Sequence, residues 1–76
     1  MTLTSSDFDL RGEHIALAAL LKASGIASSG GAAKALMAEG NVRVNGEPES
    51  HRGRKLRDGD EVTVGDQRVR VRRHDR

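Results

Sequence analysis

The segment SSGGAAK, residues 28–34, has a composition that suits contact with an anion. Either serine is a natural helix N-cap, because its hydroxyl can accept a hydrogen bond from a free backbone N–H group. Gly30 and Gly31 leave the other N–H groups of the helix start uncovered, and the positive end of the helix dipole favours a phosphate there. Lys34 lies one turn further along and can reach the same anion. The alternative is that the two glycines only permit a tight turn between helices.

A second candidate anion site is the basic segment HRGRK, residues 51–55. Arg52, Arg54 and Lys55 repel one another at this short spacing, and the repulsion destabilises a loop unless an anion relieves it. Side chains of this type contact phosphates in proteins that bind nucleic acids. The segment therefore predicts a loop that binds a polyanion.

Two further sets of cations have simpler explanations. Lys22 is suited either to an anion or to the negative end of its own helix. Arg68, Arg70 and Arg72 alternate with valines and therefore share one face of a strand. This row is either a second basic stripe or a guard that keeps a sheet edge soluble, and we favour the guard.

The sequence shows no arrangement of residues that is typical of catalysis or metal binding. It has no cysteine, and His14, His51 and His74 lack the spacing of a metal-binding motif. It also lacks a serine in the GxSxG context of a hydrolase. The acidic residues at 58, 60 and 61 flank a glycine turn without the pattern of a calcium loop. We therefore expect a protein that is not an enzyme and needs neither metal nor cofactor.

The charge distribution favours a polyanionic partner. Residues 1–50 carry four basic and six acidic side chains, whereas residues 51–76 carry nine basic and five acidic ones. Phe8 is the only aromatic residue, so binding to nucleic acid must use phosphates, sugars and shape more than stacking on aromatic side chains. The chain has no apolar stretch of the ~20 residues that a membrane helix needs, and no secretion signal. We therefore expect a cytoplasmic protein with no membrane partner.

The hydrophobic pattern predicts one small α+β domain. Apolar residues at helical spacing predict a helix at about 13–23 and a second helix that starts near residue 29 and ends at Gly40. Residues 8–10 are expected as a short edge strand, and alternating valines predict further strands separated by Asn-Gly, Asp-Gly and Gly-Asp turns. The expected fold is a two-helix hairpin packed on a small antiparallel sheet of three or four short strands. Residues 1–7 are expected to be a flexible tail, 8–73 the domain and 74–76 a basic C-terminal tail.

The block GNVRVNG followed by DGDEV, within residues 13–66, resembles the S4-type RNA-binding domain, also called the alpha-L motif. The short length and the RGRKL loop are most similar to small stand-alone bacterial members associated with the ribosome. The resemblance implies that the second helix and the strand after it face structured RNA, through Ser29, Lys34, Arg43 and Asn45. This chain departs from many relatives at Gly30 and Ala38, where they carry basic residues.

The residues and the resemblance together predict non-catalytic binding of structured RNA, ribosomal or transfer RNA, by a monomer that associates with the ribosome or ribosomal proteins. The alternative is a protein-binding adaptor of the ribosome or of another RNA-processing complex. Sequence-specific DNA binding is disfavoured, because the second helix has no row of base-reading side chains. The predicted RNA-binding residues are Ser29, Gly30, Gly31, Lys34, Arg43, Asn45, Arg52, Arg54 and Lys55, with weaker contributions from Lys22, Arg68 and Arg70.

Overall fold

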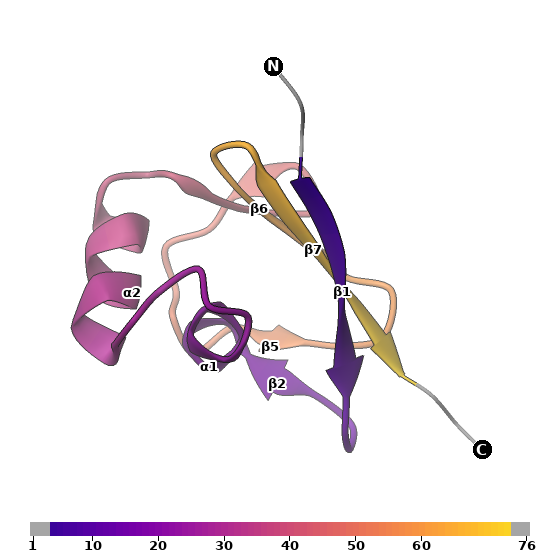
Figure 1. The fold of residues 1–76 in the computed structure, drawn as a ribbon. Helices are drawn as coiled ribbons and strands as arrows, with labels where there is room; N and C mark the ends of the chain where they lie inside the picture. The colour runs from indigo at the N-terminus through magenta and orange to yellow at the C-terminus, as the bar shows by residue number, and fades with distance from the viewer. Residues whose placement is uncertain (1–3, 74–76) are drawn as a thin grey trace.

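The computed structural model describes residues 4–73, with two helices on one side and a five-stranded sheet on the other (Figure 1). The helices are α1 (Leu17–Ala23) and α2 (Gly30–Ala38). The main sheet has the order β1-β7-β6-β3-β4, and β2 and β5 form a separate pair. The strands are β1 (Thr4–Leu10), β2 (Ile15–Ala16), β3 (Val42–Val44), β4 (Glu47–Pro48), β5 (Lys55–Leu56), β6 (Glu61–Val64) and β7 (Gln67–Arg73). The predicted α+β class is confirmed.

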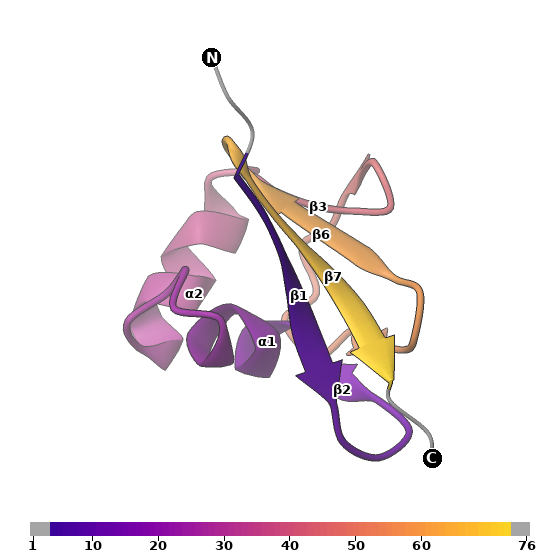
Figure 2. The same cartoon turned by 45° about the vertical axis from the view of Figure 1, so that its right-hand side comes forward.

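The sheet is larger than predicted and is mixed, not purely antiparallel. Strand β1 runs parallel to β7, while the pairs β6–β7, β3–β6 and β3–β4 are antiparallel (Figure 2). The predicted edge strand at residues 8–10 is confirmed as the end of β1. The prediction of three or four antiparallel strands was wrong, because the two-residue β4 adds a fifth strand and β1 pairs in parallel with β7, at the other end of the described chain. Local patterns of hydrophobicity carry no information about such a distant pairing.

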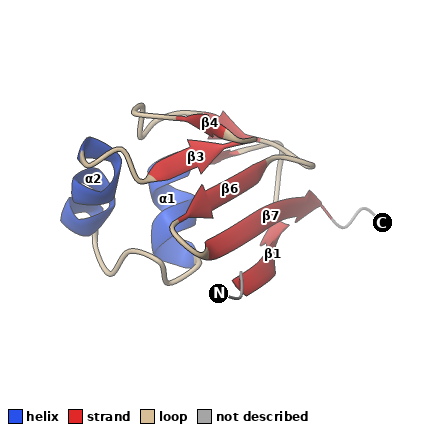
Figure 3. Cartoon of the chain, turned by 90° about the horizontal axis from the view of Figure 1, so that it is seen from above, coloured by secondary structure: helices blue, strands red, loops and turns tan. Residues whose placement is uncertain are grey.

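The core lies between the sheet and the helices, as Figure 3 shows for α1 behind the strands. Alternate valines of β3, β6 and β7 point inward, so Val42, Val62 and Val71 are fully buried. They pack in one cluster with leucines of α1, of which Leu17 and Leu20 are also fully buried. The residues between the valines therefore lie on the opposite side of the sheet, which we call the outer face.

The two helices differ in how well their starts were predicted. In α2 the Ser29 hydroxyl accepts a hydrogen bond from the Ala32 N–H at 3.1 Å, which confirms the predicted N-cap. Helix α1 begins at Leu17 and not near residue 13, because Ile15 and Ala16 pair with β5 instead. This contact with a segment far along the chain overrides the local helical spacing.

The turns between strands follow the predicted chemistry. Asn45 and Gly46 both have positive φ, 53° and 87°, and connect β3 to β4 as a two-residue hairpin loop. This conformation favours an Asn-Gly pair. Pro48 lies in β4, at the edge of the sheet, where a missing N–H group is tolerated.

The predicted N-terminal tail is wrong for residues 4–7. These residues are paired with β7 in register, from Thr4 opposite Gln67 to Leu10 opposite Arg73. Their small polar side chains gave no sign of this, since the pairing depends on β7. Residues 1–3 and the predicted tail at 74–76 lie outside the described residues.

Two proline substitutions in β1 test whether residues 4–7 are paired with β7. The Thr4 N–H donates to the Asp66 carbonyl at 2.8 Å, so the Ser6 N–H also faces β7 while the Ser5 N–H faces away. Ser6→Pro removes a ladder hydrogen bond and should lower the free energy of unfolding by about 1 kcal/mol or more. Ser5→Pro is the matched control and should cost clearly less. Urea denaturation of both variants is the measurement, and equal, negligible effects would mean that residues 4–7 are a free tail.

Candidate nucleic-acid interface

The basic loop is held against the start of α1 by backbone hydrogen bonds. Within the described residues no side chain caps this helix. Instead, the N–H of Leu17 donates to the Arg54 carbonyl at 2.8 Å, and the N–H of Ala18 donates to the Arg52 carbonyl at 2.9 Å. Because free N–H groups at a helix start need acceptors, these bonds fix the path of the loop while both arginine side chains stay exposed.

A groove of about 690 Å³ separates this loop from α2. Helix α2 lines it with Lys34, Met37 and Ala38, and the loop lines it with residues 50–54. The structure thus brings Lys34 together with Arg52 and Arg54, although they are well separated in the sequence. Among residues 4–73, neither Lys34 nor Arg52 has an ion pair or a side-chain hydrogen bond. Both charges are therefore available to an anion.

Glu49 was not among the predicted residues, and it organises the loop. Its carboxylate accepts a hydrogen bond from Arg54 Nη1 at 2.6 Å, and from the backbone N–H of His51 at 3.1 Å. His51 Nδ1 lies 3.1 Å from the same carboxylate. These hydrogen bonds, the one from Arg54 first, lower the pKa of Glu49 from 4.5 to about 2. The chain itself therefore partly relieves the repulsion between the loop cations that was expected to need an external anion. The position of an acidic residue just before a basic loop was the feature of the sequence that could have predicted this role of Glu49.

The start of α2 is open to approach by a ligand. A Cβ at Gly30 would meet no heavy atom of the described residues within 4 Å, and one at Gly31 would meet only the Ser29 hydroxyl at 3.8 Å. Neither glycine has a positive φ. The turn between the helices therefore does not require glycine at these positions, which favours the interpretation that they leave room for an anion.

Arg43 and Asn45 lie away from the groove, so the structure does not unite all the predicted residues. Arg43 points to the outer face between the buried Val42 and Val44. The Asn45 amide donates to Asp60 Oδ1 at 3.1 Å and accepts from the Glu61 N–H at 3.0 Å. This gives Asn45 a structural role at the start of β6.

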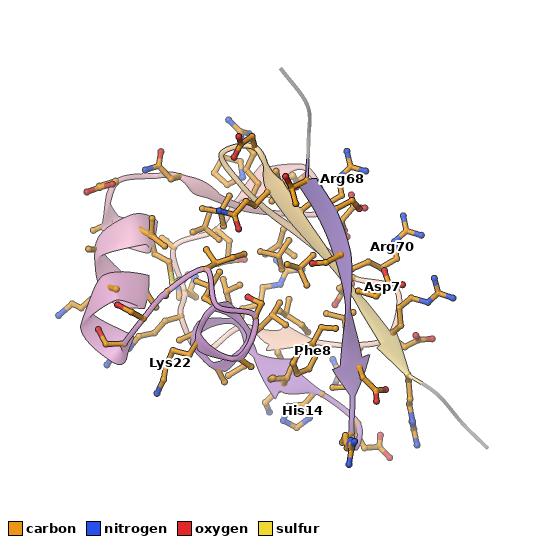
Figure 4. The ribbon with its side chains drawn as sticks, in the orientation of Figure 1. Asp7, Phe8, His14, Lys22, Arg68 and Arg70 are labelled. Carbon is orange, nitrogen blue, oxygen red and sulfur yellow. The ribbon has the colours of Figure 1, made fainter. Side chains whose placement is uncertain are left out.

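The remaining candidates are also outside the groove. Lys55 is exposed on β5, and in the described chain it is not part of the groove lining. Figure 4 shows Arg68 and Arg70 on the side of the sheet away from α1, and Lys22 on the opposite side of the molecule. Both arginines form ion pairs with Glu61, whose Oε2 lies 3.7 Å from Arg68 Nη1 and 3.2 Å from Arg70 Nη2. The expectation that this row guards a sheet edge is wrong, because β7 lies between β1 and β6. Its arginines instead pair with acidic side chains of these two neighbouring strands.

Residues 4–73 contain no cluster of three or more histidine, cysteine or acidic side chains able to hold a metal ion. In the same range, neither helix is long and apolar enough to span a membrane. His74 lies outside the described residues.

Comparison with known proteins points to one family. Residues 8–72 match the model of the S4 domain family. The chain is also similar to a protein of Bacillus subtilis (strain 168) named probable ribosome maturation protein RlbA. The two are 46% identical over 52 residues, which cover 68% of this chain and 73% of that relative.

The Glu49 network predicts a dependence of stability on pH. Because folding lowers the pKa of Glu49 from 4.5 to about 2, its contribution is full above about pH 4.5 and is lost as the pH falls towards 2. We expect Glu49→Gln to destabilise the protein at pH 7 and to have little effect near pH 2. Thermal denaturation of both proteins across this range measures the difference. A destabilisation that does not change with pH would show that the charge of Glu49 contributes nothing.

Proposed function

This chain belongs to the S4 domain family, and we propose that it binds structured RNA without catalysing a reaction. The observation that carries the proposal is the groove in which Lys34 of α2 faces the loop cations Arg52 and Arg54. The similarity to a protein named for ribosome maturation supports ribosomal RNA as the class of partner. We propose that the protein acts in the cytoplasm, as a monomer, on ribosomal RNA or on the assembling ribosome.

The distribution of charge supports RNA phosphates as the ligand. Cations on both sides of a groove can contact phosphates on two neighbouring stretches of backbone, and the open helix start beside Lys34 offers further donors. The deep major groove of an A-form helix cannot be read by side chains, so shape and phosphate spacing decide the binding. We therefore expect a preference for folded RNA with little dependence on base sequence.

A salt-series titration tests the proposal directly. The purified protein is titrated with a folded RNA hairpin and with a DNA duplex of matched length, by fluorescence anisotropy at several salt concentrations. We expect tighter binding to the RNA and a steep loss of affinity as salt rises, because binding releases counterions. Equal affinity for both would indicate only a general polyanion surface, and no binding at low salt would favour the protein-binding adaptor.

Charge reversal locates the interface. Lys34→Glu and Arg52→Glu should each weaken RNA binding and reduce the slope of log affinity against log salt by about 1. The matched control is Arg11→Glu, which changes the net charge equally in the turn after β1, where the Arg11 side chain is 88% exposed. If Arg11→Glu weakened binding as much as the groove variants, the groove would not be the interface.

A further inference from the structure

The groove is lined by uncharged residues as well as by cations. Met37 and Ala38 of α2 and Gly53 of the loop line it together with Lys34, Arg52 and Arg54. Phosphate alone needs no apolar lining, since an anion is held by cations and N–H groups. A ligand with both an anionic group and an apolar face fits this arrangement better, and within RNA that ligand is a nucleotide with its base exposed.

The groove is large enough to hold one nucleotide. About 690 Å³ lies in the range of pockets that bury most of a drug-sized molecule. A base within a duplex is stacked on both sides and cannot enter such a groove. An unpaired base can leave the stack at little cost.

Arg54 is suited to stack on that base. Phe8, the only Phe, Tyr or Trp of the chain, packs against the core and is not available. The His51 imidazole also lines the groove and is a second group able to stack on a base. An arginine guanidinium is planar and can stack on a base in place of an aromatic ring. Glu49 holds the Arg54 guanidinium at 2.6 Å, while the Arg54 side chain remains 41% exposed. The Arg54 guanidinium is therefore both held in orientation and accessible to a base.

We propose that the groove takes one unpaired nucleotide of the RNA. The base lies against Met37 and Ala38 and stacks on Arg54, and the nucleotide's phosphate lies near Lys34 and Arg52. Glu49 is a positioning residue that holds the Arg54 guanidinium. The proposal rests on the proposed RNA-binding function, which it makes more specific.

Three RNA hairpins of identical stem and loop test the proposal. One is fully paired, one has a single unpaired adenosine in the stem, and one has an abasic nucleotide at that position. The abasic hairpin keeps the extra phosphate and the flexibility but lacks the base. We expect the hairpin with the unpaired adenosine to bind roughly tenfold more tightly than the abasic one, since stacking of one base contributes at this scale.

Variants that keep the charge assign the stacking to Arg54. Arg54→Lys preserves the positive charge but removes the plane, so the ratio of affinities for the adenosine and abasic hairpins should fall to about 1. The matched control is Arg57→Lys, in the turn outside the groove lining, which should keep the ratio. Glu49→Gln is a second variant, and by loosening Arg54 it should lower the ratio partly. Circular dichroism melts establish that each variant is folded.

The outcomes separate this proposal from the function on which it rests. Equal binding of the adenosine and abasic hairpins would overturn the nucleotide site while leaving RNA binding intact. A ratio that Arg54→Lys does not change would overturn the role of Arg54. Failure to bind any of the three hairpins at low salt would overturn the proposed function itself.

Discussion

The start of α1 has two N–H groups whose acceptors come from the basic loop, and the arrangement of the binding face depends on these bonds. The carbonyls of Arg52 and Arg54 accept from Ala18 and Leu17. A side-chain cap on α1 would have satisfied the helix equally well, and the loop would then be held beside α1 only through the pairing of β5 with β2. Because α1 is buried against the sheet, the loop is tied to the core of the protein and its arginines face α2 across the groove.

The chain uses its charges in two ways, and the difference distinguishes the two basic surfaces. On the outer face, arginines of β7 are paired with Glu61 and Asp7, so their positive charge is partly compensated. Along the groove, one carboxylate, Glu49, organises the loop and pairs with Arg54, while Lys34 and Arg52 have no ion pair within residues 4–73. The arrangement of acidic residues therefore indicates the binding surface more clearly than the number of basic ones.

Local sequence pattern was sufficient wherever the structure depends on neighbouring residues. The Ser29 cap and the Asn45–Gly46 turn were predicted because each is specified within a few positions. Residues 4–7 of β1 and the late start of α1 were missed, because each depends on pairing with a distant segment.

The sequence predicted the cations of the groove but not that they lie together. Lys34, Arg52 and Arg54 were each identified from the sequence, but the backbone carbonyls that bring the loop to α1 leave no mark on side-chain composition. Asn45 is assigned to RNA only by the family resemblance, whereas its amide bonds Asp60 and the Glu61 N–H at the start of β6. The measurement that tests the central claim most directly is two-dimensional NMR of the ¹⁵N-labelled protein titrated with a folded RNA hairpin. The account predicts amide shift changes concentrated at residues 30–38 and 50–54, and changes concentrated on the outer face at residues 68–72 would contradict it.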